Sequence, residues 1–274
     1  MPSRNAPPDP PLGDSITWGY LSSDGNGYRL PLQQNLAGSD LVFIGSQRAG
    51  NMTNNENEGH PGATINQIAG YAKNNSALPA RPNIVLLHAG TNDLNGVDVK
   101  DPYDAAPERL GTLIDEIVDA CPDAAVLVAK IINAANSTTE SRIQTFNAQV
   151  PVVVAQRADK GEKVMAVDMT SIGVNDLKDG LHPTDEGYRR MGDIWFKAIQ
   201  TVVKNGWVSE PVDVGGNTIV DGNIYRQSQY QNMETSDRAR TMLASEEEKA
   251  TGYLATLRVQ ITDLVAREQN LGLV

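Results

Sequence analysis

The sequence predicts an α/β fold in which a central parallel sheet lies between two layers of helices. Short apolar segments that suit buried strands alternate with segments whose apolar side chains repeat at helical spacing. This alternation is typical of parallel sheets, because their crossover connections are usually helices. The predicted strands are residues 41–44, 83–89, 125–132 and 164–169. Together these observations predict a three-layer sandwich.

We expect the first strand of this sheet to be shortened or missing. A buried strand should precede Ser15, but four of the residues 5–11 are prolines. Proline is nearly absent from central strands because it has no N–H to donate. We therefore expect at most one or two ladder-bonded residues just before Gly13. The neighbouring strands 41–44 and 83–89 would then have unpaired edges.

The other elements follow from turn signals and helical repeats. Residues 46–62 are polar and rich in Asn and Gly, which predicts an ordered loop at the rim of a site rather than a packed element. Apolar side chains at three- and four-residue steps predict amphipathic helices. The predicted helices are residues 28–36, 64–72, 110–121 and 142–160, and a last helix that Thr184 opens.

The chain is predicted to consist of a main domain at residues 1–208 and a linker with a helical tail at 209–274. Turn-forming residues are frequent at 213–223. Between 250 and 265, apolar residues repeat at helical spacing for about two heptads, which is too short for a dependable coiled coil. Such a tail either packs on the main domain or pairs with another chain, and the sequence leaves the oligomeric state open.

The amino-acid composition excludes several classes of binding partner. The chain has 34 acidic and 23 basic residues and a net charge of −11, which repels phosphate backbones and anionic lipids. No apolar run reaches the ~18 residues that span a bilayer. We therefore expect neither nucleic acid nor a membrane as a partner. The only cysteine, Cys121, excludes a disulfide within the chain and a cysteine metal cluster, and we expect no metal or other cofactor.

Two sequence motifs together contain the three side chains that a serine nucleophile requires. A serine hydroxyl needs a base within hydrogen-bond reach and a group that fixes the tautomer of that base. His182 follows Asp179 by three residues on a turn-rich segment, so one loop can carry both groups. His88 lies in an apolar run and is better explained as a buried strand histidine. We predict Ser15 as nucleophile, His182 as base and Asp179 as the orienting carboxylate, although each motif alone also fits a helix cap or a turn.

Four blocks in this order resemble the SGNH (GDSL-like) hydrolases. They are residues 13–17, the glycine of 60–62, residues 90–93 and residues 179–183. The resemblance covers residues 12–206 and implies a flavodoxin-like fold and ester hydrolysis. It also implies an oxyanion hole formed by the backbone N–H groups of Ser15 and Gly62 and the side-chain amide of Asn92.

Local sequences narrow the resemblance to the acetylxylan esterases of carbohydrate esterase family three. These sequences are residues 13–17, 27–29, 44–46, 58–62 and 179–183. The resemblance implies removal of small acyl groups, with acetyl first, from a carbohydrate such as xylan. It also implies secretion, and three Asn-x-Ser/Thr sequons agree. The single cysteine instead favours a cytoplasmic protein, and residues 1–11 carry no apolar signal segment.

A sugar ester would suit a rim of polar and aromatic side chains. We predict substrate contacts at Trp18, Tyr28 and His60, and Tyr20 is a further aromatic residue near the nucleophile. Two other functions stay open. One is a lysophospholipase or acyl-thioesterase on the same fold, which would need a longer apolar groove than the polar segment 46–62 predicts. The other is a non-catalytic remnant with an interaction helix, if the first strand is absent.

Overall fold

The structure is a computed structural model that describes residues 8–37, 42–74, 77–96, 101–208, 218–220 and 223–225. The chain divides into two compact units, residues 1–223 and 224–274. In the second unit only Ile224 and Tyr225 are described. The predicted tail helix at 250–265 therefore lies outside the described residues, and the predicted division between residues 208 and 209 stays a prediction.

The first unit contains a six-stranded sheet with the order β4-β5-β2-β6-β7-β8. Five of its strands run parallel, and β4 pairs antiparallel with β5 at one edge. A second, two-stranded parallel sheet is formed by β1 and β3. The strands are β1 (Pro8–Asp9), β2 (Pro11–Gly13), β3 (Val42–Phe43), β4 (Gln47–Arg48), β5 (Glu56–Gly59), β6 (Ile84–His88), β7 (Ala125–Ala129), β8 (Val164–Val167), β9 (Thr218–Val220) and β10 (Asn223–Tyr225).

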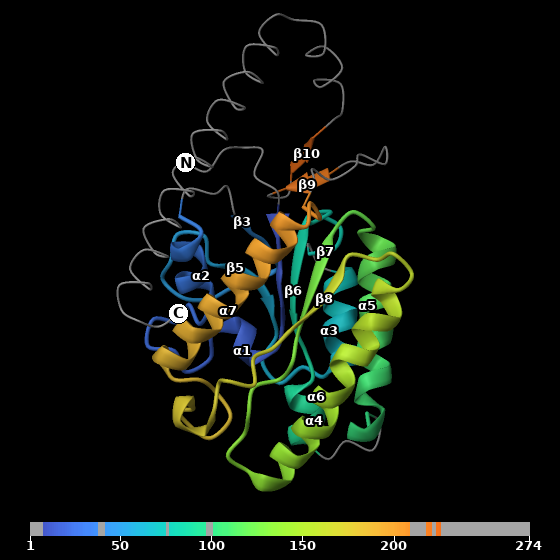
Figure 1. The fold of residues 1–274 in the computed structure, drawn as a ribbon. Helices are drawn as coiled ribbons and strands as arrows, with labels where there is room; N and C mark the ends of the chain where they lie inside the picture. The colour runs from blue at the N-terminus through green and yellow to red at the C-terminus, as the bar shows by residue number, and fades with distance from the viewer. Residues whose placement is uncertain are drawn as a thin grey trace, which may run out of the picture. The chain divides into compact units, whose positions relative to one another are not determined.

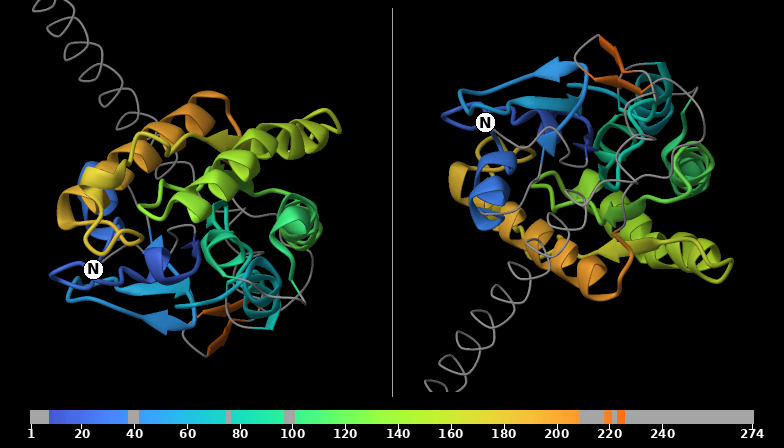
Figure 2. Two further views of the ribbon diagram at one scale, coloured as in Figure 1. Left: turned by 90° about the horizontal axis from the view of Figure 1, so that it is seen from below. Right: turned by 90° about the horizontal axis from the view of Figure 1, so that it is seen from above.

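Helices cover both faces of the six-stranded sheet, as the sequence predicts. Figure 1 shows α1, α2 and α7 on one face and α3, α5 and α6 on the other, and Figure 2 shows these layers from below and from above. The helices are α1 (Ser15–Trp18), α2 (Arg29–Asn35), α3 (Ile65–Asn74), α4 (Thr91–Asn95), α5 (Ala106–Ala120), α6 (Ser137–Ala158) and α7 (Asp185–Lys204), with short 3-10 turns η1 (Tyr103–Ala105) and η2 (Val174–Asp176). The predicted three-layer α/β sandwich is confirmed.

The central strands are buried on both faces. In β6, Leu87 belongs to the apolar cluster beneath α3, α5 and α6, while its neighbour Leu86 belongs to the cluster beneath α2 and α7. In β7, Val126 and Leu127 divide between the clusters in the same way. Alternate side chains of a strand point to opposite faces. A strand covered on both sides therefore reads as a continuous apolar run, which is why β6 and β7 are visible in the sequence.

Residues 8–13 form two short strands, β1 and β2, on either side of Pro10, and the strands next to them are paired. β2 lies between β5 and β6, and β1 pairs with β3. The carbonyl of Pro10 accepts a hydrogen bond from the N–H of Leu86 at 3.2 Å, and Oδ1 of Asp9 accepts one from the N–H of Ile84 at 3.1 Å. The expectation of unpaired edges is therefore wrong. Proline loses its donor but keeps its carbonyl, and the side-chain oxygen Oδ1 of Asp9 supplies a second acceptor to β6.

The polar segment 46–62 contains two strands, which corrects the expectation of a loop. β4 and β5 lie within it, and β5 is a neighbour of β2 inside the sheet. Asn57 and Glu58 of β5 are both fully buried. Oδ1 of Asn57 accepts a hydrogen bond from the N–H of Gly59 at 2.9 Å. A strand with buried polar side chains shows no apolar run, so hydrophobic periodicity could not reveal it.

Candidate active site

Ser15 lies directly beyond the carboxyl end of β2, where it begins α1. Oδ1 of Asp14 accepts a hydrogen bond from the N–H of Ile16 at 2.9 Å and caps the helix. A Cβ atom at Gly13 would lie 2.3 Å from the carbonyl oxygen of His88 and 2.4 Å from Oγ1 of Thr17. Glycine at position 13 therefore lets the strand pass close to β6 just before it turns into the helix.

His182 and Asp179 lie on one closed loop beside Ser15. Nε2 of His182 is 2.9 Å from Oγ of Ser15, and Nδ1 of the same ring is 2.8 Å from Oδ2 of Asp179. An isolated pair of backbone contacts between Leu177 and Pro183 closes the base of the loop. The structure thus brings the three predicted residues into one hydrogen-bonded chain. Such a chain can remove the proton from a serine hydroxyl as the oxygen attacks.

The carboxylate of Asp179 is stabilised by several donors. Its Oδ1 accepts hydrogen bonds from the backbone N–H groups of Leu181 at 3.0 Å and His182 at 2.8 Å. Burial raises the pKa of Asp179, but the hydrogen bonds from the backbone and ring of His182 and from Leu181 outweigh it and hold the pKa below its ordinary value. Asp179 is therefore charged at neutral pH, as a partner of Nδ1–H must be.

Three further contacts tie the histidine loop and α7 to the segment after Ser15. The hydroxyl of Tyr188 donates to the carbonyl of Tyr20 at 2.7 Å, and Oδ1 of Asp185 accepts from the N–H of Ser23 at 2.8 Å. The ring of Tyr20 packs edge-on against the ring of His182, with centroids 4.8 Å apart. Tyr20 is 43% exposed. It is therefore a fixed aromatic ring at the surface beside the imidazole.

Gly62 and Asn92 lie on segments that contact each other. Asn92 is the second residue of α4, which follows β6, and its Nδ2 donates to the carbonyl of Ala63 at 2.9 Å. Gly62 belongs to the turn closed by the N–H of Ala63 and the carbonyl of His60 at 3.0 Å, and its φ is +82°. That turn begins beside β2, because the N–H of His60 donates to the carbonyl of Gly13 at 3.0 Å.

The predicted substrate contacts fare differently. Tyr28 is completely buried and its hydroxyl donates to Oγ1 of Thr17 at 3.1 Å, so the prediction of a substrate contact there is wrong. Its ring packs into the core with that of Trp195, 6.0 Å away between centroids. Trp18 is half-buried at the end of α1. The side chain of His60 is 12% exposed.

Arg29 is a structural residue that sequence reasoning missed. It is fully buried, and burial lowers the pKa of its guanidinium to about 10. The guanidinium donates to the carbonyl of Trp18, at the end of α1, at 3.0 Å. It also donates to the carbonyls of Gly25, Ala49 and Asn55. Arg29 therefore joins α1 to the loops around it, and the nearest sequence signal was its place in the Gly-Tyr-Arg motif.

His88 is the last residue of β6 and is fully buried, as predicted for a strand histidine. Its ring has no exposed surface, and neither ring nitrogen has a hydrogen-bond partner among the described residues. Burial lowers the pKa of His88, although the nearby charge of Asp14 acts in the opposite direction. We assign it no chemical role.

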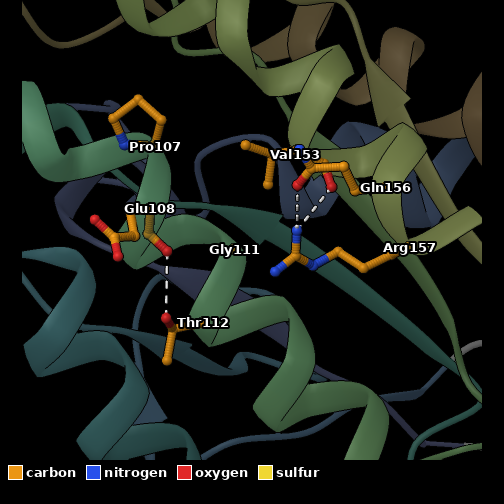
Figure 3. Close-up of a pocket in the computed structure, with 7 residues that line it drawn as sticks. All are labelled: Pro107, Glu108, Gly111, Thr112, Val153, Gln156 and Arg157. Atoms are coloured by element: carbon orange, nitrogen blue, oxygen red, sulfur yellow. Dashed lines mark hydrogen bonds between the residues drawn. The ribbon is translucent and has the colours of Figure 1, made fainter.

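A groove between α5 and α6 lies apart from these residues. It encloses about 310 Å³ and is lined by side chains of both helices, with Arg157 at one side (Figure 3). Arg157 is occupied by Asp115, whose oxygens lie 2.9 Å from Nε and 2.6 Å from Nη2. None of the predicted site residues lines it. Within the described ranges no three acidic, histidine or cysteine side chains form a metal-binding group, and no helix is long and apolar enough to cross a bilayer.

Comparison with known proteins places the chain in a family. Residues 12–190 match the GDSL-like Lipase/Acylhydrolase family. Over 226 residues the chain is 28% identical to a multidomain esterase of Ruminococcus flavefaciens, covering 71% of this chain and 28% of that protein. The chain thus spans less than a third of the length of that relative. It belongs to the GDSL-like lipase/acylhydrolase family, a family of carboxylic ester hydrolases.

Solved structures support the narrower resemblance. A family 3 carbohydrate esterase of Clostridium thermocellum is 31% identical, with a TM-score of 0.60, and the match covers 73% of this chain and 98% of that one. A carbohydrate esterase family 3 protein of Talaromyces cellulolyticus is 24% identical, with a TM-score of 0.59, covering 72% and 98%. At that identity the second likeness concerns the fold alone. The predicted resemblance to SGNH hydrolases and to this esterase family is confirmed.

Proposed function

We propose that the chain is a serine esterase that removes short acyl groups, acetyl first, from a carbohydrate such as xylan. The observation that carries the proposal is the pair of contacts from Ser15 to His182 at 2.9 Å and from His182 to Asp179 at 2.8 Å. Family membership supports the reaction class. The likeness to a family 3 carbohydrate esterase supports the substrate class.

In the proposed reaction, Oγ of Ser15 attacks the ester carbonyl carbon while Nε2 of His182 takes the hydroxyl proton. Asp179 holds the proton on Nδ1, so that Nε2 is free to act as the base, and stabilises the imidazolium that forms. His182 then gives its proton to the leaving sugar oxygen as the C–O bond breaks. Water, deprotonated by His182, then attacks the acyl carbon. The bond from that carbon to Oγ of Ser15 breaks, His182 returns the proton to Oγ, and the acyl group leaves as the carboxylic acid.

The negative oxygen of the tetrahedral intermediate needs donors that are already in place. We assign this role to the backbone N–H groups of Ser15 and Gly62 and to Nδ2 of Asn92. The contact from Asn92 to the carbonyl of Ala63 supports the assignment, because it holds the amide beside the turn that contains Gly62. One such donor is worth about 10²- to 10³-fold in kcat.

The carbohydrate part of the proposal has a second support in the exposed ring of Tyr20. Aromatic rings offer an apolar face with polar edges, which suits packing against a sugar. This ring lies 4.8 Å from that of His182, where the sugar side of the ester would leave. A polysaccharide substrate lies outside the cell, so the proposal includes secretion. Detection of the protein in the culture medium of its host would test that part.

An assay over ester chain length tests the proposal. The intact chain should hydrolyse 4-nitrophenyl acetate faster than the butyrate, and the octanoate least, and should release acetate from acetylated xylan. Ser15→Ala should abolish all of these activities, whereas Ser141→Ala, an exposed serine on α6, should leave them unchanged. Fastest turnover of the octanoate would favour a lipase. Full turnover by Ser15→Ala would refute the mechanism, and no turnover by the intact chain would indicate a remnant.

A further inference from the structure

Glu58 is a carboxylate enclosed beside the strand that leads to the nucleophile. It lies in β5, pairs with Leu12 of β2 and has no exposed surface. Its Oε1 accepts a hydrogen bond from Oγ of Ser46 at 2.8 Å, and its Oε2 accepts one from the N–H of Ser46 at 2.8 Å. A third contact joins Oε1 to Nε2 of His60 at 2.5 Å. A carboxylate is rarely buried unless such partners compensate for its lost hydration.

The ring of His60 is held on two sides. Nε2 contacts Glu58, and the face of the ring stacks on Tyr71 of α3, with centroids 3.8 Å apart and an angle of 14° between the planes. Only 12% of the side chain is exposed. A ring whose nitrogen and face are both occupied offers little to a substrate. These contacts instead hold the backbone of His60 at a fixed point.

That fixed point begins the turn of Gly62. The backbone N–H of His60 donates to the carbonyl of Gly13, and its carbonyl accepts from the N–H of Ala63, both at 3.0 Å. Gly62 itself is exposed, and no described atom lies within 4 Å of the place where its Cβ would be. On that side, Gly62 has no neighbour among the described residues other than those next to it in the chain. The position of the turn depends on its two ends, which are His60 and the Ala63 carbonyl held by Asn92.

We propose that Glu58 and His60 are positioning residues that hold the N–H of Gly62 toward the reacting oxygen. The proposal rests on the function proposed above, and it replaces the predicted substrate contact at His60. A displacement of about 1 Å at a reacting group can lower a rate about 10²-fold. The hydrogen bonds at the start of this turn, at His60, therefore bear directly on turnover.

Three variants of the intact chain test whether the hydrogen bond between Glu58 and His60, here called the anchor, matters more than a substrate contact of His60 or its stacking on Tyr71. His60→Phe keeps a ring on Tyr71 but removes the donor to Glu58, and it should lower kcat for 4-nitrophenyl acetate by about 10- to 100-fold. KM should stay within about twofold, because the loss falls on the transition state. His60→Gln can still donate to Glu58 and should restore kcat to within about threefold of the parent. Tyr71→Leu keeps the hydrogen bonds of His60 to Glu58 and to the carbonyl of Gly13. Its kcat should therefore also stay within about threefold of the parent.

Other outcomes would overturn the proposal. An unchanged kcat in His60→Phe would show that the anchor is dispensable, and a raised KM with unchanged kcat would restore His60 as a substrate contact. An equal loss in Tyr71→Leu would assign the anchoring to the ring stack instead of Glu58. If His60→Phe does not fold, His60→Ala carries the same expectation.

A second measurement judges the anchor without relying on activity. Hydrogen exchange of the peptide covering residues 60–64 should become faster in His60→Phe, and by more than exchange in β6 does. The melting temperature should fall, because Glu58 stays buried with one partner fewer. Unchanged exchange in that peptide would refute the anchor. If the parent chain hydrolyses no ester but the exchange result holds, the proposed function fails and the anchor stands.

Discussion

Oγ of Ser15 lies 2.9 Å from Nε2 of His182, although 167 residues separate the two in the chain. The distance is set by two separate supports. Ser15 is fixed by the end of β2, and His182 by a loop tied to Asp179. The contacts of Tyr20 and Ser23 with α7 then join the two supports. The predictions below follow from this arrangement and from the buried groups around it.

Asp179→Asn should lower kcat while the fold is kept. An amide at this position can hold the wrong tautomer of His182, and the loss for such a change is on the order of 10²- to 10⁴-fold. The side chain of Asp179 is 42% exposed, so water can replace part of its role. Steady-state kinetics with circular dichroism would test this. Turnover equal to that of the parent would remove Asp179 from the proposed mechanism.

Asn92→Ala should reduce kcat by about 10²- to 10³-fold, or about 2.7–4 kcal/mol of transition-state stabilisation. The change removes a proposed oxyanion donor and also the contact to Ala63. Asn35→Ala, an exposed amide on α2, provides the control and should have no effect. A loss of less than about threefold in Asn92→Ala would mean that the amide does not face the oxyanion.

Gly59→Ala should displace α1. A Cβ there would lie 2.4 Å from the backbone nitrogen of Trp18 and 2.8 Å from the carbonyl carbon of Thr17. Overpacking of this kind destabilises by about 1–3 kcal/mol, and because α1 begins at Ser15, kcat should fall as well. Gly70→Ala on α3 meets no described atom within 4 Å and should stabilise by about 0.5–1 kcal/mol. The free energy of unfolding in urea and kcat should be measured for both variants. If Gly59→Ala changed neither, the close packing of Gly59 against α1 would be contradicted.

Asp9→Asn should stabilise the protein increasingly as the pH rises. Burial raises the pKa of Asp9 well above 3.8, so the folded state holds a proton that the unfolded state has lost. The stability that Asp9 contributes is therefore present below 3.8 and is lost as the pH rises toward the folded pKa. Asparagine keeps an oxygen for the N–H of Ile84 without a charge. The free energy of unfolding, measured at several pH values, should exceed that of the parent by an amount that grows as the pH rises. For Asp104→Asn, a change at an exposed position, the difference should not depend on pH. A difference that stays constant in Asp9→Asn would contradict the prediction.

Removal of residues 224–274 should leave kcat/KM for acetyl esters within about twofold, since a compact unit is expected to retain its own site. All residues of the proposed site lie in the unit 1–223. Sedimentation of the full and shortened chains would also show whether the tail mediates association. Loss of soluble protein on truncation would indicate instead that the tail covers part of the core.

Local sequence determined the parts of the site that lie close together in the chain. The three-residue step from Asp179 to His182 lets one loop hold both groups, and the turn at Gly13 can be read from the residues beside it. The apolar strands β6 and β7 were equally visible, because burial on both faces requires a continuous apolar run. These features predicted the fold class and named the three residues that the structure brings into contact.

Other features depend on partners that are distant in the chain, and only the tertiary structure decided them. Pro10 joins the sheet because Leu86 donates to its carbonyl, and the buried Glu58 is compensated by Ser46 and His60. Tyr28 was predicted to be an exposed substrate contact, but the folded chain buries it completely in the core. A polar or proline-rich segment carries no periodic signal of burial, since what makes its burial favourable is the set of hydrogen bonds that folding supplies.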